Sequence, residues 1–409
     1  MNNVRTVAGA TAAVAVLALI VVFFVWQNRT LNTVGIVEQV VPQLPAVEQV
    51  IPEVDMAAQA TAEPAAVETI TDEQLFEAVS AADAAAVERL LKAGANPDAI
   101  KPSGYPILKA AILDATKNRN TEIVTLLVEN GADVNLLDGG GNAVLPLAVG
   151  ARQLEVVQLL LDAGADVNGT STISVEDVGM LKDAPAIIHA AIGNKIEIVE
   201  LLIAHGADLD KAESSTNQTA LHVAAALDNS KIIEALLVSG ANPDPPGSKT
   251  PLHVASEIQK VRSAQALLDG GADPNAQTTQ GKNPLMYAVS LGQGPSFQST
   301  GIVTVLLEGG ADPDQTDESD RTVLHHAANK GKDAVIPILI EHGASIDLQD
   351  NTGKTALHLA AQRGRPKAVS ALIEQGASLN LKNEEGQTAL DVAKNEAIAE
   401  LLREAGAGE

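Results

Sequence analysis

The chain of 409 residues contains no cysteine and few aromatic residues: one Trp, two Tyr and four Phe. The absence of cysteine excludes disulfides, thiolate metal sites and a cysteine nucleophile. Three of the aromatic residues, Phe23, Phe24 and Trp26, lie near the N-terminus. A folded core in the rest of the chain must therefore be built mainly from Ala and Leu.

Positive charge is also scarce. The chain has 27 Lys and Arg against 52 Asp and Glu, a formal net charge of −25. Nucleic acid is a poor partner, because phosphate binding needs clustered Lys and Arg, and the sequence shows neither a basic stripe nor interleaved aromatic residues. The same charge repels anionic lipid surfaces and favours a basic protein or a cationic ligand. The alternative is a surface whose charge serves only solubility.

What the chain does contain is a repeat. Helix-like apolar runs end in Gly-Ala at ten places, with successive glycines 30 to 42 residues apart, most often about 33. These glycines are Gly94, Gly131, Gly164, Gly206, Gly240, Gly271, Gly310, Gly343, Gly376 and Gly406. A period of this length predicts a stacked array, and one elongated domain instead of two or three globular ones.

One unit shows how the pattern predicts structure. Thr355 is suited to cap a short helix over residues 356–361, and a second helix over residues 368–373 ends where Gly376 can adopt a positive φ. Residues 377–386 are rich in turn formers. The predicted unit is helix, turn, helix, turn.

These residues resemble the ankyrin repeat, over roughly residues 71–409. Near-complete copies of its signature are Thr219-Ala220-Leu221-His222, Thr250-Pro251-Leu252-His253, Thr322-Val323-Leu324-His325 and Thr355-Ala356-Leu357-His358. The resemblance implies an all-α solenoid of about ten helix-turn-helix units with projecting turn fingers. It also implies that each signature His is structural and bonds the backbone of the neighbouring finger.

Such an array needs polar ends, because its inner units expose apolar faces to their neighbours. Residues 71–94 fit an N-terminal cap, and Thr71-Asp72-Glu73-Gln74 is a candidate capping box. Residues 387–409 fit a C-terminal cap. We expect the array to be bounded on both sides.

A different segment precedes the array. Residues 6–28 carry no charge and lie between Arg5 and Arg29, after a short flank of residues 1–5. About 20 apolar residues span a bilayer, so this segment predicts an uncleaved transmembrane signal-anchor helix, with a cleaved signal peptide as the alternative. The positive-inside rule favours a cytoplasmic N-terminus and an array outside the cytoplasm, periplasmic in a Gram-negative bacterium. Residues 29–70, rich in Pro, Val, Glu and Ala, read as a linker.

No residue pattern points to catalysis, a cofactor or a metal. Signature histidines one repeat apart are too far from each other to share a zinc ion. Asp and Asn recur in pairs within the fingers, from Asp133/Asn135 to Asp312/Asp314, and fit side chains that bond turn backbone. Gly139-Gly140-Gly141 lacks the Lys of a phosphate loop and reads as a turn.

The longer spacings indicate inserts, which are expected on exposed loops. They fall at residues 114–120, 169–183 and 292–299. Phe297 is the candidate contact residue in the third insert, and Glu176 and Asp177 are candidates in the second. Tyr287 fits helix packing.

The sequence therefore predicts a membrane-tethered scaffold, not an enzyme, that binds a protein partner through fingers, concave face and inserts. The alternatives are a hydrolase with a site at the inserts and a passive spacer in the cell envelope.

Overall fold

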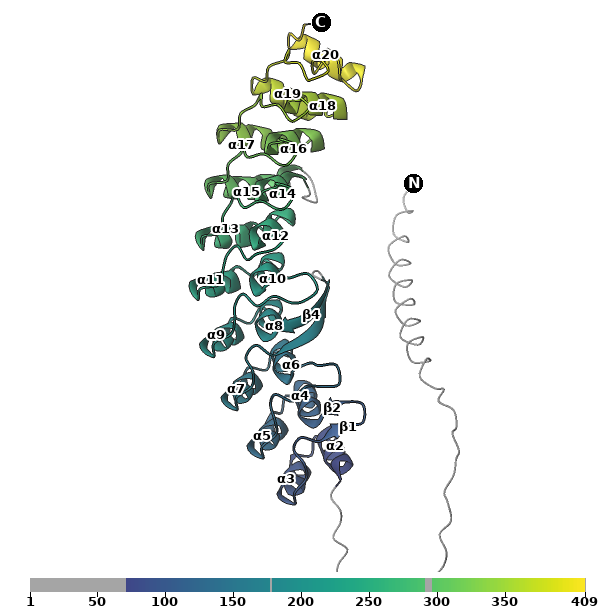
Figure 1. Cartoon of the computed structure of the whole chain (residues 1–409), viewed down its shortest axis with the longest axis vertical. Helices are drawn as coiled ribbons and strands as arrows, with labels where there is room; N and C mark the ends of the chain where they lie inside the picture. The colour runs from purple at the N-terminus through teal and green to yellow at the C-terminus, as the bar shows by residue number, and fades with distance from the viewer. Residues whose placement is uncertain (1–70, 177–178, 291–295, 409) are drawn as a thin grey trace, which may run out of the picture. The chain divides into compact units, whose positions relative to one another are not determined.

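The array is a stack of antiparallel helix pairs. The computed structural model describes residues 71–176, 179–290 and 296–408, and these belong to one compact unit, residues 68–409. In Figure 1 the first helix of each pair forms one row and the second helix forms a parallel row beside it. Each helix contacts its partner and the equivalent helices of neighbouring pairs, as α12 contacts α13, α10 and α14. The predicted helix-turn-helix stack is confirmed.

The two rows have the following bounds. The first row is α2 (Asp72–Ser80), α4 (Ile107–Asn118), α6 (Val144–Gly150), α8 (Ala186–Gly193), α10 (Ala220–Ala226), α12 (Pro251–Glu257), α14 (Pro284–Ser290), α16 (Val323–Lys330) and α18 (Ala356–Arg363). The second row is α3 (Ala84–Lys92), α5 (Glu122–Glu129), α7 (Leu154–Asp162), α9 (Ile196–Ala204), α11 (Ser230–Val238), α13 (Val261–Asp269), α15 (Ser296–Glu308), η1 (Asp333–Val335) with α17 (Ile336–Glu341), α19 (Pro366–Glu374) and α20 (Glu396–Glu404).

Glycine ends every unit as expected. All ten glycines of the Gly-Ala pairs have positive φ, between 80° and 99°. A residue with a Cβ is strained in this conformation, and glycine is not. The repeat spacing therefore reports the helix ends.

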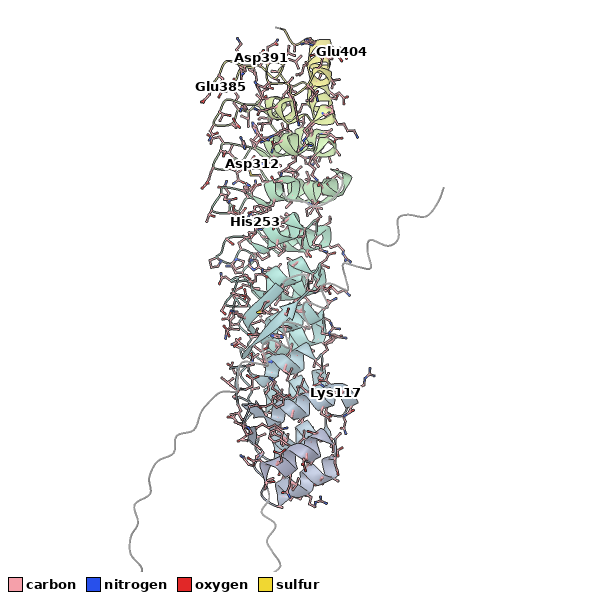
Figure 2. The ribbon with its side chains drawn as sticks, turned by 90° about the vertical axis from the view of Figure 1, so that its right-hand side faces the viewer. Lys117, His253, Asp312, Glu385, Asp391 and Glu404 are labelled. Atoms are coloured by element: carbon pink, nitrogen blue, oxygen red, sulfur yellow. The ribbon has the colours of Figure 1, made fainter. Side chains whose placement is uncertain are left out.

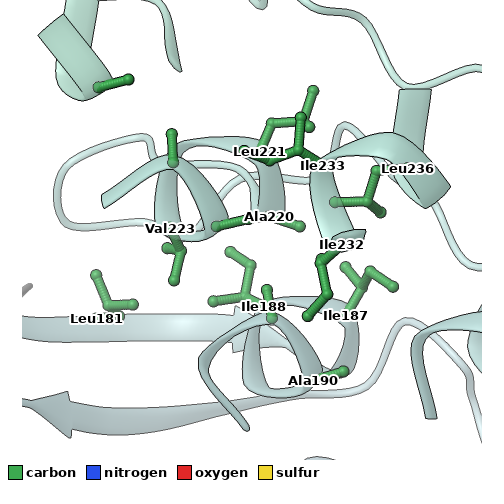
Figure 3. Close-up of a cluster of buried hydrophobic side chains, with 14 of the residues drawn as sticks. Leu181, Ile187, Ile188, Ala190, Ala220, Leu221, Val223, Ile232, Ile233 and Leu236 are labelled. Carbon is green, nitrogen blue, oxygen red and sulfur yellow. The ribbon is translucent and has the colours of Figure 1, made fainter. Parts of the chain in front are cut away.

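Small aliphatic side chains fill the space between the rows. Figure 3 shows side chains of α8, α10, α11 and the adjacent strand β4 meeting in one buried cluster, among them Ile188, Leu221 and Ile233. Each is at most 1% exposed. The predicted Ala and Leu are abundant in the core, and Ile and Val contribute to it as well.

The prediction of an all-α fold is only partly right, because two β-hairpins occur between units. β1 (Ile100–Lys101) pairs with β2 (Tyr105–Pro106), and β3 (Thr170–Val175) pairs with β4 (Gly179–Pro185), both antiparallel. The insert at residues 169–183 forms most of the second hairpin. The array is mostly helical, with this hairpin beside α8 (Figure 1).

The other two inserts were expected as loops, but the described part of each is largely helical. α4 has 12 residues and α15 has 13, whereas α10, α12 and α14 have 7 each. Residues 114–118 extend α4 at its C-terminal end, and residues 296–299 form the first turn of α15. Residues 291–295, between α14 and α15, lie outside the described residues.

The two ends of the array differ from its middle. Thr71 and Gln74 form the predicted capping box, with each side chain bonded to the other residue's backbone N–H. In the last unit, residues 389–392 form turns where other units have a first-row helix, and α20 follows.

The expected flank, anchor and linker at residues 1–5, 6–28 and 29–70 lie outside the described residues. Among the helices that the structure describes, none combines the length and the apolar character needed to cross a bilayer.

Candidate functional site

The signature histidines join successive units. Each sits in the first turn of a first-row helix, where its Nδ1 accepts a hydrogen bond from the backbone N–H of the signature Thr at 3.1 to 3.2 Å. Nε2 is then the protonated nitrogen and donates to a carbonyl oxygen of the next finger. These bonds are His222 to Lys249 O (2.9 Å), His253 to Lys282 O, His325 to Lys354 O and His358 to Gln387 O (3.0 Å each). The structural role implied by the resemblance is confirmed.

Burial keeps these imidazoles neutral. It lowers the pKa of all four, and that of His253 to about 4, although the carbonyl acceptor on each Nε2 acts in the opposite direction. With both nitrogens in hydrogen bonds, none of the four presents a lone pair to a metal. In residues 71–176, 179–290 and 296–408, no three His, Asp or Glu side chains are grouped closely enough to hold a metal ion.

Tyr287 lies against this network. Its ring and that of His253 are nearly perpendicular, at a centroid distance of 5.2 Å, and the Lys249 ammonium lies 4.8 Å from the centre of the Tyr287 ring. Tyr287 is only 6% exposed. The prediction that it packs within the helices is confirmed.

The acidic pairs of the fingers form a continuous ladder. Within a finger, the first side chain of the pair accepts from the backbone N–H two residues later, as Asp133 does from Asn135 at 2.8 Å. The second side chain accepts from a backbone N–H of the next finger, as Asn135 does from Asp166 at 2.7 Å. Equivalent links between fingers run through Asp98, Asn168, Asp210, Asp244, Asn275, Asp314, Asp347 and Asn380. The predicted turn role is confirmed, and the link between units was not foreseen.

The β3–β4 hairpin is the largest departure from the repeat. Its β-branched residues, among them Thr170, Ile173 and Val175, suit a strand. Leu181 and Ala184 of β4 are buried against the helices, at 1% and 0% exposure. The insert therefore packs on the array along part of its length and does not simply project.

Glu213, in the finger between α9 and α10, anchors the hairpin by hydrogen bonds. Its carboxylate accepts hydrogen bonds from Ser215 and Thr216 of its own finger and, at 3.3 Å, from the backbone N–H of Lys182 on β4. Burial alone would raise the pKa of Glu213, but the bonds from Ser215 and Thr216 outweigh it and lower the pKa to about 2. The backbone N–H of Ser214 also donates to Lys182 O at 2.8 Å. The anchor lies about thirty residues from the strand, so no local sequence signal marks it.

Beyond this anchor the hairpin presents an apolar side chain to solvent. Met180 of β4 is 59% exposed, although its backbone oxygen accepts a bond from Ser215 at 3.1 Å. Unbranched Met adapts to irregular partner surfaces. An exposed Met on an anchored hairpin is a candidate contact that no local sequence pattern marks.

The predicted contact residues do not form one cluster. Glu176 directly follows β3 and is exposed, and Asp177 lies outside the described residues. Phe297 is in the first turn of α15, not in a loop, and its side chain lies outside the description. α15 and the hairpin belong to different units, with α10 to α13 between them.

A Ser–His contact bears on the hydrolase alternative. Ser171 Oγ lies 3.1 Å from His189 Nε2, and His189 is 4% exposed. Burial lowers the pKa of His189 to about 4, with backbone bonds to Ser171 and Ala184 acting in the opposite direction. An effective general base has a pKa near the working pH. The contact therefore suits a structural tie between β3 and α8 better than catalysis.

Basic residues recur on the edge of the stack opposite the fingers. The fingers lie on one edge, where Figure 2 labels Asp312 and Glu385, and the turns within helix pairs lie on the other, with Lys117. Basic residues recur on these turns, at Lys117, Arg119, Arg152, Lys195, Lys260, Lys330, Lys332, Arg363, Arg365, Lys367 and Lys394. The sequence analysis noted no basic stripe, because these residues are far apart in the sequence and only the repeat brings them to one edge.

Comparisons with known proteins agree with this architecture. A family model described as ankyrin repeats (3 copies) matches residues 75–171, 173–247, 229–317, 296–383 and 324–408. The nuclear factor NF-kappa-B p105 subunit of Gallus gallus is 32% identical over 126 residues, which are 31% of this chain and 12% of that protein. The chain thus matches only a small part of that relative. The family match covers nearly the whole array and coincides with its helix pairs and histidine bonds, so this chain belongs to the ankyrin-repeat family.

Proposed function

We propose that this protein is a membrane-tethered scaffold that binds a partner protein through its fingers, its first-row helices and the β3–β4 hairpin. Ankyrin repeats imply a protein partner, and such proteins are typically interaction scaffolds and not enzymes. The single observation that carries the proposal is Met180, which is 59% exposed on a hairpin held by the Glu213 anchor. A fixed apolar contact loses little conformational entropy on binding.

Charge supports a basic partner. The finger edge carries acidic clusters such as Asp312, Asp314, Glu318 and Asp320 in one finger. Complementary charge accelerates encounter, and salt screens this effect. Association should therefore be faster at low salt than at high salt.

The tether rests on residues 6–28, whose uncharged apolar character suits a signal-anchor helix. In this proposal the N-terminus lies in the cytoplasm and the array outside it, in the periplasm if the cell is Gram-negative. The protein should stay in the membrane fraction after a high-salt wash, and a reporter fused to the C-terminus should signal outside the cytoplasm. A soluble product that begins near residue 30 would contradict the anchor, and a cytoplasmic signal would contradict the orientation.

The binding proposal is tested by crosslinking in membranes, followed by affinity purification and mass spectrometry. Met180→Ser should reduce recovery of the main partner at least several-fold, because an exposed anchor residue contributes about 1 kcal/mol or more to binding. Val238→Ser is the matched control, since Val238 is 90% exposed on the second-row helix α11. Phe297→Ala tests the second candidate contact in the same way.

Equal recovery with Met180→Ser and Val238→Ser would remove the hairpin from the binding surface. Failure of any protein to co-purify with the crosslinked wild type would favour the passive-spacer alternative.

A further inference from the structure

Basic side chains gather on the turns of the last three units, and we call this set the basic ridge. It comprises Lys330, Lys332, Arg363, Arg365, Lys367 and Lys394. Carboxylates are few on these turns: Asp333 follows Lys332, and Glu396 is paired with Arg403 at 2.6 Å. In the part of the chain that the structure describes, no ion pair involves Lys330, Arg363, Arg365, Lys367 or Lys394. The ridge concentrates positive charge on a chain whose net charge is −25.

Contacts between successive turns hold the ridge in line. A Cβ added to Gly331 would lie 2.9 Å from Cδ of Arg365, and one added to Gly364 would lie 2.7 Å from Cδ of Lys394. The aliphatic stem of each cation thus lies over the glycine of the preceding turn.

The arginine head groups are also fixed. Arg363 Nε donates to Asn329 Oδ1 at 2.8 Å, and Arg365 Nε donates to Asn329 O at 3.4 Å. Two guanidinium groups from one turn are therefore held at the end of the preceding first-row helix α16. Less side-chain entropy is lost when an anion binds groups that are already positioned.

Helix electrostatics explain only part of the ridge. Lys330 and Arg363 lie in the last turns of α16 and α18, where positive charge is favourable. Arg365 is the N-cap of α19 and Lys367 is in its first turn, where the helix dipole disfavours positive charge. No side chain caps α19. The placement of these two cations therefore calls for a role other than helix stability.

We propose that the basic ridge binds an extended acidic segment of a partner polypeptide. Stacked helices lie about 8 to 10 Å apart, and an extended chain in the polyproline II conformation rises about 3.1 Å per residue with three residues per turn, so that every third side chain lies on the same side. Carboxylates about three residues apart would thus meet successive turns. This surface lies on the edge opposite the fingers and includes the last turns of the first-row helices α16 and α18, but neither the fingers nor the β3–β4 hairpin.

A polypeptide suits the ridge better than the other polyanions. Bases of single-stranded nucleic acid stack on aromatic side chains, and the basic ridge contains none. A broad anionic membrane or duplex would also lie in the repulsive field of the acidic chain. A narrow segment with spaced carboxylates avoids both problems.

The probe is a fluorescein-labelled synthetic peptide of about fifteen residues, with Glu at every third position and Ser and Gly between. Its binding to the full-length chain in nonionic detergent is measured by fluorescence anisotropy over a range of salt concentrations. The variant Arg363→Gln, Arg365→Gln, Lys367→Gln should weaken binding at least about tenfold and flatten the salt dependence. The matched control, Lys92→Gln, Lys231→Gln, Lys382→Gln, removes the same charge from exposed lysines elsewhere and should change binding less than about twofold.

Three results would overturn the proposal. The first is an equal loss in the two triple variants, which would show that only net charge matters. The second is no binding by the wild type, or equal binding of a peptide with Gln in place of Glu. The third is tighter binding of a single-stranded oligouridine or of phosphatidylglycerol vesicles than of the acidic peptide. Met180→Ser should leave peptide affinity unchanged, so that this test and the test of the proposed function fail independently.

Discussion

Replacing His253 with Leu should destabilise the array through two orphaned backbone groups. His253 accepts from the backbone N–H of Thr250 at 3.1 Å and bonds Lys282 O at 3.0 Å, and it is 1% exposed. A buried polar group without a partner costs about 1 to 3 kcal/mol. For the two groups together, the free energy of unfolding at pH 7.5 should therefore fall by about 2 to 6 kcal/mol.

The decrease in the free energy of unfolding caused by His253→Leu should be smaller at lower pH. Because burial lowers the pKa of His253 to about 4 from 6.5, the unfolded chain binds this proton first as the pH falls. The stability that depends on the neutral imidazole is complete above pH 6.5 and is lost progressively toward pH 4. At pH 5 the free energy of unfolding of the wild type is lower by about 2 kcal/mol because of this one group. The difference in the free energy of unfolding between wild type and His253→Leu should decrease by that amount.

The assay is urea unfolding of the full-length chain followed by far-ultraviolet circular dichroism, at pH 7.5 and pH 5. His205→Leu is the control, because His205 is exposed at the C-cap of α9. The other signature histidines remain in both proteins and cancel in the comparison. A gap that is equal at the two pH values would refute the reasoning that His253 is neutral in the folded state and protonated in the unfolded state.

Two further substitutions test the packing of the stack. Leu357→Ala should lower the free energy of unfolding by about 2 to 5 kcal/mol in the same urea assay, because Leu357 is 1% exposed in the core; a loss below about 0.5 kcal/mol would place it outside the core. Gly353→Ala should destabilise by more than about 1 kcal/mol, because φ is +73° and the new Cβ would lie 2.7 Å from Glu384 N of the next finger. Unchanged thermal unfolding of that variant would show that the two fingers are not in close contact.

Features that depend on neighbours in the sequence were predictable. The positive φ of Gly376 and the capping box of Thr71 follow from local helix-end chemistry, and both are present. The bond from His358 to Gln387 O was implied by the ankyrin resemblance and recurs because each unit repeats its neighbour. In these cases the residue and its partner keep a fixed separation along the chain.

Features that depend on particular distant contacts were not predicted. The second insert folds as the β3–β4 hairpin because Leu181 is buried against the helices and the Glu213 carboxylate accepts a hydrogen bond from the backbone N–H of Lys182. Local sequence propensity predicts neither contact. The basic ridge was missed for another reason. Lys332 and Arg365 are far apart in the sequence, and only an alignment of the units shows that they occupy the same turn position. The net charge of −25 gave no sign of this local cluster of basic residues.

The ladder of Asp and Asn side chains has a mechanical consequence. Each rung joins a finger only to the next finger, as Asp314 joins Ser345 by its backbone N–H at 2.8 Å. Under tension applied to the ends of the chain, the stack should open from a terminal unit inward, and each unit of about 33 residues should release roughly 110 Å of chain. The array would then lengthen in regular increments and recover them in reverse order when the load falls, as expected of a molecular spring.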